Sequence, residues 1–224
     1  MKLYSGDLSP YSSKVRMQIY AKGLDHIAVE SPTGFMTSAW RESSPSRIGR
    51  LPILELDDGQ VVVESAVIAE YLEATYPEPS LLGATPLESA TVRTLANIAD
   101  LYLTTNLFNM TGGKGRPLTE GPVRDRATAG LLRGFSSLAE MIGDRGYACL
   151  GRLTLADCAL VPALFQLENI LQATGTPNPI PSQPRIAAYW SAIQHHPAAA
   201  RVLGEMRRGL DARIEAVRRA EATA

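Results

Sequence analysis

The sequence predicts two domains of different fold class: an α/β domain of order βαβ-α-ββα over residues 1–78, and an all-α helical bundle over residues 87–224. Three observations support this division. Strand and helix signals alternate in the first third of the chain, whereas only helical periodicity continues after it. Residues 79–86, which join the two regions, contain two prolines and a glycine and therefore favour a linker.

The first domain is expected to contain a strand, a helix, a strand, a spacer helix, a hairpin and a final helix. The strand, helix and hairpin signals fall at residues 2–5, 12–22, 24–30, 51–56, 60–64 and 66–76. Gly23 stands where the first helix needs a C-cap, and Pro77 stops the last helix. Alternation in the second strand puts Ile27 and Val29 on one face. The turn Asp57-Asp58-Gly59 between two β-rich runs indicates a hairpin.

The second domain is expected to be a bundle of helices joined by short loops. Helical periodicity covers residues 87–110, 123–142, 154–173, 184–195 and 197–224, and a loop containing Gly and Pro is expected at 111–122. The helix at 154–173 begins with Thr154-Leu155-Ala156-Asp157, a capping box with Asp in place of Glu, and Leu153 before it is a hydrophobic-staple candidate. We interpret this box as structural.

Composition excludes several classes of function. A net charge of −1 gives no electrostatic reason to expect nucleic acid or an anionic membrane as a partner. No apolar run approaches the ~20 residues of a membrane helix, and the absence of a signal peptide predicts a cytoplasmic protein. Cys149 and Cys158 are interpreted as small core residues in a reducing compartment. His26, His195 and His196 lack partners at metal-ligand spacing, so no metal is predicted.

Four short segments together resemble the cytosolic glutathione S-transferase superfamily. They are Ser9-Pro10-Tyr11-Ser12-Ser13-Lys14-Val15-Arg16, Gly49-Arg50-Leu51-Pro52-Ile53-Leu54, Glu64-Ser65-Ala66-Val67-Ile68-Ala69-Glu70-Tyr71-Leu72 and Leu153-Thr154-Leu155-Ala156-Asp157. Their order and spacing cover nearly the whole chain. The chain resembles a bacterial, serine-type member with a theta/zeta/omega-like loop. The resemblance implies a thioredoxin-like first domain, glutathione as co-substrate, a small hydrophobic electrophile as second substrate and a homodimer.

Ser9 is the predicted catalytic residue. It lies just before the first helix, near the positive end of the helix dipole and its unpaired N–H groups. Lowering a thiol pKa by ~2 units from ~8.5 requires about 2.7 kcal/mol, and one charge-assisted hydrogen bond supplies ~1.5–3 kcal/mol. A hydroxyl and the dipole can therefore stabilise a glutathione thiolate. The alternative is that Ser9 only caps the helix. Tyr4 and Ser12 remain open as other candidate hydroxyls.

Leu51, Pro52, Glu64 and Ser65 are the predicted glutathione-binding residues. The resemblance implies a cis Pro52, with the backbone of Leu51 facing the cysteinyl part of glutathione; a trans proline beginning an edge strand is the alternative. Ser65 and the first N–H groups of its helix suit a carboxylate, and Glu64 suits an ammonium group. The γ-glutamyl end of glutathione carries both groups on one carbon. A serine that only caps the helix is the alternative here.

The active-site loop also departs from some relatives. Classes with thiol–disulfide activity carry Cys where this chain has Ser9, which argues against that chemistry. The maleylacetoacetate isomerases carry Ser-Ser-Cys, whereas Pro10 and Tyr11 follow the serine here. The loop therefore does not assign the chain to that class.

The predicted function is a detoxifying glutathione transferase that joins the glutathione thiolate to an electrophile. Tyr102, Asn106, Phe108 and Met110 are candidates for the electrophile pocket, with core positions as an equal alternative. A glutathione-dependent isomerase of the maleylacetoacetate or maleylpyruvate type is a second possibility. A third is a non-catalytic binding or regulatory module, as in the stringent-starvation proteins that contact RNA polymerase. The sequence identifies neither the electrophile nor the transferase class.

Overall fold

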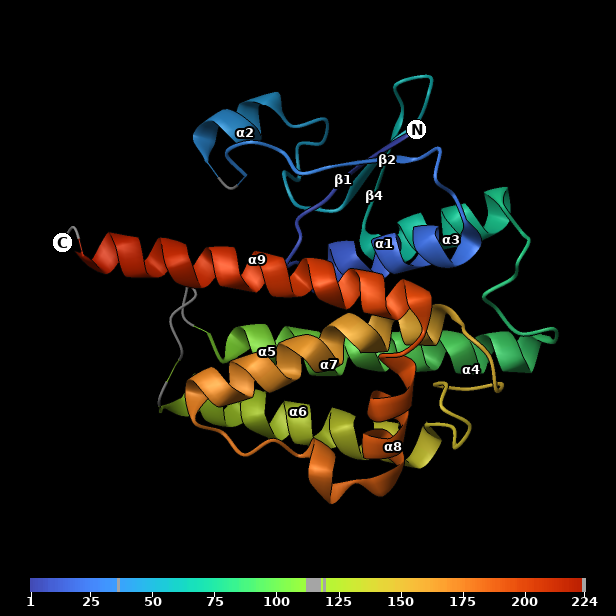
Figure 1. Cartoon of the computed structure of the whole chain (residues 1–224), viewed down its shortest axis with the longest axis vertical. Helices are drawn as coiled ribbons and strands as arrows, with labels where there is room; N and C mark the ends of the chain where they lie inside the picture. The colour runs from blue at the N-terminus through green and yellow to red at the C-terminus, as the bar shows by residue number, and fades with distance from the viewer. Residues whose placement is uncertain (36, 112–117, 119, 223–224) are drawn as a thin grey trace. The chain divides into compact units, whose positions relative to one another are not determined.

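The computed structural model describes residues 1–35, 37–111, 118 and 120–222. The chain divides into two compact units, Met1–Pro79 with Ala200–Ala224, and Ser80–Ala199 (Figure 1). The helix α9 begins in the second unit and continues in the first. The predicted domain limits, 1–78 and 87–224 with a linker at 79–86, stay a prediction, because a compact unit in space is not necessarily a folding domain.

The first unit has the predicted order of strands and helices. Its elements are β1 (Lys2–Tyr4), α1 (Pro10–Lys22), β2 (Ala28–Glu30), α2 (Ser38–Ser43), β3 (Ile53–Glu55), β4 (Val61–Val63) and α3 (Ser65–Thr75), to which the C-terminal part of α9 (Pro197–Ala222) is added. The four strands form one mixed sheet in the order β2-β1-β3-β4. β1 is parallel to β2 and antiparallel to β3, which is antiparallel to β4. This arrangement confirms the predicted thioredoxin-like fold.

The side chains of successive strand residues point to opposite faces of this sheet. Leu3 and Leu54 belong to the core that α1 and α3 close on one side. Ile53 packs on the other side with Trp40 of α2, and the ring of Tyr4 lies 6.2 Å from that of Trp40. Figure 1 shows α1 and α3 side by side below the strands and α2 above them. The sheet is therefore covered by helices on both faces.

Two local predictions in this unit have different outcomes. Gly23 ends α1 with φ 64°, the left-handed conformation that glycine adopts without strain, as predicted. Ile27 is buried, but Val29, expected on the same face, is 39% exposed. Val29 lies in β2, which is an edge strand of the sheet formed by the described residues.

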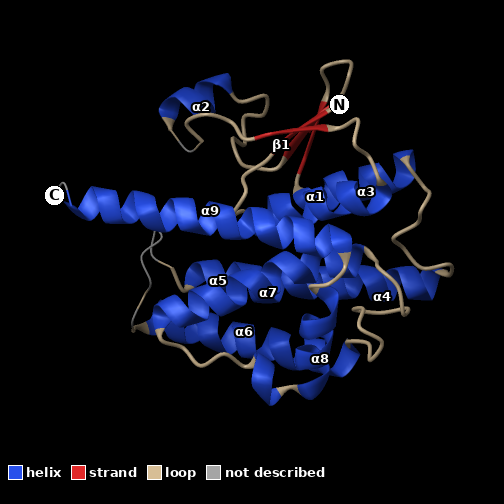
Figure 2. Cartoon of the chain, in the orientation of Figure 1, coloured by secondary structure: helices blue, strands red, loops and turns tan. Residues whose placement is uncertain are grey.

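The described elements of the second unit are all helices (Figure 2). They are α4 (Pro86–Asn97), the π-helix η1 (Ile98–Thr104), α5 (Thr105–Asn109), α6 (Pro122–Met141), α7 (Leu155–Thr174), the 3-10 turn η2 (Ile180–Ser182), α8 (Pro184–Ile193) and the start of α9. This confirms the predicted all-helical C-terminal region. Of the loop expected at 111–122, positions 112–117 and 119 lie outside the described residues.

The predicted long helix at 87–110 is interrupted by the π-helical turns of η1. Both the backbone N–H and the hydroxyl of Thr105 donate to the carbonyl of Asp100, five residues earlier, and this spacing widens the turn. The neighbouring helix α6 meets this stretch with Gly130 and Gly134. A Cβ on Gly134 would lie 2.4 Å from the Cβ of Tyr102. The absence of side chains at these glycines therefore allows the two helices to approach closely.

Candidate functional site

Three of the predicted site segments meet at one edge of the sheet. In the ladder, Tyr4 at the end of β1 pairs with Ile53 at the start of β3, which pairs with Val63 at the end of β4. The loop that leads to Ser9 begins just after Tyr4. Pro52 directly precedes Ile53, and Glu64 directly follows Val63. The antiparallel register therefore brings the segments together, although they are far apart in the sequence.

Ser9 is the N-cap of α1, and Pro10 holds the first helical position, where its missing N–H costs nothing. The Ser9 Oγ accepts a hydrogen bond from the Ser12 N–H at 3.3 Å, and the Ser9 side chain is half-buried. That bond uses a lone pair of the oxygen and leaves the hydroxyl hydrogen for another acceptor. Capping and donation to a ligand are thus compatible roles for Ser9.

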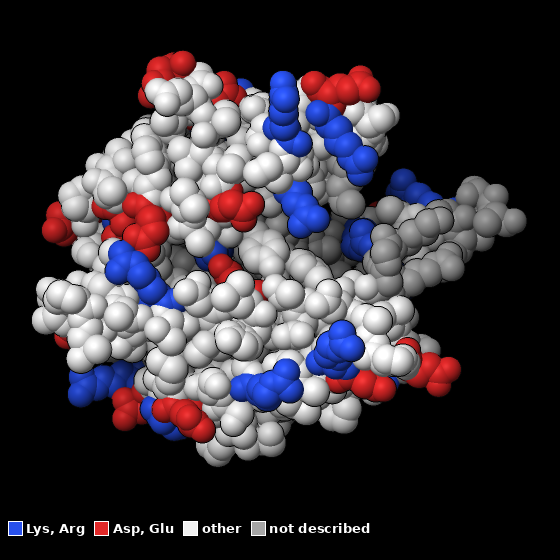
Figure 3. Space-filling view, turned by 180° about the vertical axis from the view of Figure 1, so that it is seen from behind, with Lys and Arg blue, Asp and Glu red and all other residues white. Residues whose placement is uncertain are grey.

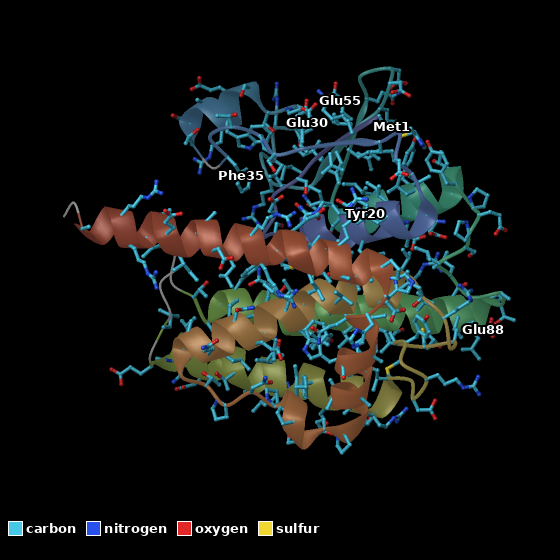
Figure 4. All side chains as sticks on the ribbon, in the orientation of Figure 1. Met1, Tyr20, Glu30, Phe35, Glu55 and Glu88 are labelled. Atoms are coloured by element: carbon cyan, nitrogen blue, oxygen red, sulfur yellow. The ribbon has the colours of Figure 1, made fainter. Side chains whose placement is uncertain are left out.

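The other two candidate hydroxyls have different surroundings. Ser12 is fully buried and its Oγ accepts from the Gly6 N–H at 3.3 Å. The Tyr4 hydroxyl donates to Oε2 of Glu55 at 2.8 Å, and this bond, with burial, raises the pKa of Tyr4. Figure 4 shows Glu55 on the side of the sheet away from α1. Of the three, Ser9 has the hydroxyl best placed to meet a ligand at the N-terminus of α1.

The cis-proline loop lies beside the Ser9 loop. The Leu51–Pro52 peptide bond is cis, as the resemblance implies. A Cβ on Gly6 would lie 3.7 Å from Cδ1 of Leu51 and 3.7 Å from the Cβ of Ser9. Gly6 therefore lies close to the side chains of both Leu51 and Ser9. The indole N–H of Trp40 donates to the Gly49 carbonyl at 2.9 Å and fixes the segment before the proline.

Glu64 and Ser65 differ from their predicted capping arrangement. Ser65 was expected as the N-cap of α3, but Glu64 holds that position and Ser65 is the first helical residue, buried at 7% exposure. The chain makes its turn at Glu64, with φ 69°, a conformation that costs a non-glycine residue ~1–3 kcal/mol. The Glu64 side chain is exposed and caps no helix N–H. Strain of this kind is typical of functional sites.

Arg16 is a part of this site that the sequence did not single out. Its side chain is 1% exposed, and its guanidinium donates to the loop that joins β1 to Ser9. Its only sequence signal was its place at the end of the first motif. Arginine is ordinarily exposed, so the burial of Arg16 could not be predicted from its place in the helix.

In the second unit, Asp157 has a structural environment. Its carboxylate accepts hydrogen bonds from the Thr154 N–H at 2.8 Å, the Thr154 hydroxyl at 2.9 Å and the Ala148 N–H at 2.8 Å. Burial raises the pKa of Asp157 to about 6, more than these bonds lower it. The carboxylate closes the N-terminus of α7 and ties it to the preceding loop, as the predicted capping box requires.

The four candidate residues of the electrophile pocket differ in solvent exposure. Met110 is fully buried and belongs to the core of the second unit. Tyr102 is 49% exposed and Phe108 is 39% exposed. Asn106 is half-buried, and its amide donates to the Tyr102 carbonyl at 2.7 Å. Core packing thus accounts for Met110, while the two aromatic side chains are accessible.

A hollow of about 460 Å³ also lies within the second unit, beside the start of α4. Glu88 (Figure 4), Arg145 and Arg152 are among its lining residues. The Arg152 guanidinium donates to the carbonyls of Ser80 and Leu82, and Glu88 accepts from the N–H groups that begin α4. The side chains of Arg152 and Glu88 are thus already engaged in hydrogen bonds within the fold. None of the predicted site residues lines this hollow.

The described part of the chain shows no group of three or more His, Cys, Asp or Glu side chains placed to hold a metal ion. None of its described helices is long and apolar enough to cross a membrane. On the face seen in Figure 3, acidic and basic side chains are interspersed. That distribution gives no single-sign field over this face.

Comparisons with known proteins identify the family. Residues 3–80 match the model of the glutathione S-transferase N-terminal domain, and residues 121–190 match that of the C-terminal domain. The maleylacetoacetate isomerase of Pseudomonas aeruginosa is 31% identical over 207 residues, which cover 88% of this chain and 93% of that protein. A glutathione S-transferase of Pseudomonas putida is 26% identical over 223 residues, which cover 97% of this chain and 98% of that protein.

A solved structure of a glutathione S-transferase from Methylobacillus flagellatus has the same fold. Its TM-score is 0.77 at 23% identity, over 90% of this chain and 98% of that chain. The chain therefore belongs to the glutathione S-transferase family, a family of enzymes. The names of its relatives include both transferases and an isomerase, so conjugation and isomerisation both fit.

Proposed function

We propose that the protein conjugates the thiolate of glutathione to a small hydrophobic electrophile, with Ser9 as the catalytic residue. The observation that carries this proposal is the position of Ser9: a half-buried hydroxyl at the N-terminus of α1 that keeps its hydrogen while it caps the helix. A thiolate beside it receives a hydrogen bond and the favourable field of the helix dipole. The thiol then loses its proton to water near neutral pH, and the thiolate attacks the electrophilic carbon. The carbon–sulfur bond forms as a leaving group such as chloride departs with its electron pair, or as a polarised double bond opens and its other carbon takes up a proton.

The remaining predicted residues suit the rest of glutathione. The backbone of Leu51, before the cis Pro52, would pair with the cysteinyl part. The N–H groups at the start of α3, with Ser65, would receive the γ-glutamyl carboxylate, and the exposed Glu64 carboxylate would receive the ammonium group. The ladder places these segments at the same edge of the sheet as the Ser9 loop. No metal is required in this scheme.

Retention on glutathione resin, followed by turnover of an aryl chloride activated by nitro groups, tests the proposal. Ser9→Ala should lower kcat by about 10–100-fold while the protein stays folded, because one charge-assisted hydrogen bond to the thiolate is lost. Tyr4→Phe is the matched control, since it also removes one hydroxyl near the same edge, and it should leave turnover unchanged. Equal activity of wild type and Ser9→Ala would refute the role of Ser9.

Isomerisation is a second candidate, favoured by the 31% identity to the maleylacetoacetate isomerase. Here the thiolate adds to a cis carbon–carbon double bond, the new single bond rotates, and the thiolate leaves to restore a trans double bond. Glutathione is regenerated, and Ser9 has the same role as in conjugation. Conversion of maleylpyruvate or maleylacetoacetate to the fumaryl isomer, without net loss of glutathione, would favour this reaction over conjugation.

We also propose a cytoplasmic homodimer that binds neither nucleic acid nor membrane and acts in detoxification. Light scattering at micromolar concentration should give twice the mass of the chain, and a monomer would contradict the dimer. The alternative of a non-catalytic regulatory module predicts no retention on glutathione resin and no turnover of either substrate class. A strained Glu64 at the sheet edge supports a ligand site, since a scaffold gains nothing from that strain.

A further inference from the structure

One face of the C-terminal helix packs along α1 and the loop before Ser9. Within the first unit, α9 presents Arg201, Glu205 and Gly209 at intervals of four residues, which places them on one helical face. They meet, in order, the ring of Tyr20, the guanidinium of Arg16 and the backbone of residues 7–8. Figure 4 shows Tyr20 where α1 faces α9. The same face of α9 thus follows α1 back to the start of the helix.

Arg16 is the centre of this contact. Its Nη1 donates to the hydroxyl of Ser5 at 2.6 Å and to the carbonyl of Gly6 at 3.0 Å. Its Nη2 donates to the carbonyl of Asp7 at 2.8 Å and to the hydroxyl of Ser13 at 2.9 Å. One buried guanidinium therefore holds three consecutive residues of the loop between β1 and Ser9 against α1.

The loop held by Arg16 leads directly to Ser9. The carbonyl of Gly6 that accepts from Arg16 also accepts from the Ser9 N–H, at 3.0 Å. The Gly6 N–H in turn donates to the Ser12 Oγ in the first turn of α1. A shift of Arg16 would move this carbonyl, and the backbone of Ser9 would move with it.

Glu205 of α9 supplies the charge that Arg16 needs in its buried position. Its Oε2 lies 2.9 Å from Nε of Arg16, and its Oε1 accepts from the Tyr20 hydroxyl at 2.8 Å. The Arg16 partners in the loop are carbonyls and hydroxyls, apart from the exposed Asp7 carboxylate at 3.7 Å. Removing one partner of a buried ion pair strongly destabilises the folded protein. Glu205 therefore fixes the position of the guanidinium.

Gly209 brings α9 against the loop itself. A Cβ at this position would lie 2.9 Å from the backbone N of Leu8, closer than real Cβ atoms approach, and 3.0 Å from the Cβ of Asp7, which is a tight contact. Any other residue would push the helix and the loop apart. Gly204, five residues or about 1.4 turns earlier, has no such contact, because the nearest atom to its Cβ position is Nη1 of Arg208 at 3.7 Å.

We propose that α9 positions the catalytic hydroxyl: Glu205, acting through Arg16, and Gly209, by direct contact, hold residues 5–8 so that Ser9 points at the glutathione sulfur. The inference rests on the function proposed for Ser9. Arg16, Glu205 and Gly209 are positioning residues that need not touch the ligand. The C-terminal helix is thereby part of the machinery that sets the reactivity of glutathione.

The test compares Gly209→Ala and Glu205→Gln with Gly204→Ala as the matched control. Gly204→Ala and Gly209→Ala make the same change in one helix, but only the second places a methyl group against the loop. Hydrogen exchange of the peptide covering residues 5–12 reports on the order of the loop. The pKa of the thiol in bound glutathione, read from thiolate absorbance against pH, reports on the effect on Ser9.

Gly209→Ala and Glu205→Gln should speed exchange in this peptide, raise the thiol pKa by about 1 unit and lower kcat/KM by about 10-fold, which are equivalent free-energy changes. The glutathione KM should change much less, and Gly204→Ala should match wild type throughout. A purely structural role would lower the unfolding temperature but leave the thiol pKa unchanged, and that result would overturn the proposal.

Ser9→Ala, measured in parallel, separates failure of this inference from failure of the proposed function. If Ser9→Ala raises the thiol pKa and the α9 variants do not, the inference is wrong and the function of Ser9 stands. If Ser9→Ala leaves the thiol pKa at the wild-type value, the proposed function fails and the catalytic part of the inference fails with it. Hydrogen exchange then still decides whether α9 orders the loop.

Discussion

Two helix N-termini in this chain, those of α1 and α7, differ in how their hydrogen-bonding groups are used. At α7, the buried Asp157 carboxylate accepts from two backbone N–H groups and from the Thr154 hydroxyl. At α1, the half-buried Ser9 oxygen accepts one bond of 3.3 Å from Ser12. No acidic residue occupies the first turn of α1, whereas Asp157 lies in the first turn of α7.

This difference separates structural capping from ligand binding. A terminus whose first turn contains a buried carboxylate already has a negative charge near the positive end of its dipole, so it has less need of an external anion. A terminus with one weak neutral cap retains the field that attracts an anion. Similar capping motifs in the sequence therefore serve different purposes, and the charge and burial of the capping group distinguish them.

Removing the carboxylate of Asp157 should produce the largest change in stability. Asp157→Ala leaves the N–H groups of Thr154 and Ala148 buried without their acceptor, and we expect a loss of about 3–4 kcal/mol in the free energy of unfolding. Ser9→Ala should cost about 1 kcal/mol, as expected for the loss of one half-buried helix cap. Urea unfolding measures both.

The exposed Asp144 provides the control for this comparison, because Asp144→Ala should change stability by less than about 0.5 kcal/mol. Glutathione affinity per folded molecule should be unchanged in Asp157→Ala. A selective loss of glutathione binding in that variant would show that the α7 terminus is more than structural.

The raised pKa of Asp157 predicts how stability depends on pH. A carboxyl with a pKa of 3.8 in the unfolded chain and about 6 in the folded chain binds more protons when folded. Its contribution is therefore fully present below about pH 4 and is lost as the pH rises through 6, by about 3 kcal/mol in total. Unfolding of wild type and Asp157→Asn between pH 4 and 7 should diverge by this amount, and parallel profiles would refute the assignment.

Glu64 tests whether strain at the open edge of the sheet serves the ligand. Glu64→Gly should relieve the left-handed backbone and stabilise the protein by about 1 kcal/mol, while it removes the carboxylate. Glu64→Gln keeps the strain and should leave stability unchanged. Both should weaken glutathione binding by about 2 kcal/mol, measured by calorimetry, through loss of the ammonium partner. Binding at wild-type affinity in both variants would remove Glu64 from the site.

The local signals in the sequence were sufficient for most of the fold. Gly23, the Asp57-Asp58-Gly59 turn and the Thr154 to Asp157 box each act through bonds between near neighbours, and the structure contains all three as predicted. The exposure of Val29 was missed because a strand pattern does not reveal which strand lies at the edge. The cap of α3 was misplaced by one residue, since a positive φ at Glu64 has no sequence signal.

The site was predictable only in part. Ser9, Pro52 and Glu64 could be picked from motifs, and the strand register explains why they converge. The support of Ser9 could not be predicted, because Glu205 and Gly209 lie 196 and 200 residues after Ser9 in the sequence. Their contacts depend on how α9 packs. Burial of Arg16 beside a carboxylate from another helix is a tertiary fact that local periodicity does not contain.

In the proposed mechanism, the Ser9 hydroxyl lowers the pKa of the glutathione thiol. The decisive measurement is the pH titration of thiolate absorbance in the complex of glutathione with wild type and with Ser9→Ala, at saturating glutathione. We predict that the thiol pKa in the variant rises by about 1–2 units toward ~8.5, the value of an unperturbed thiol. An identical pKa in the two complexes would contradict this mechanism and leave Ser9 as a helix cap alone.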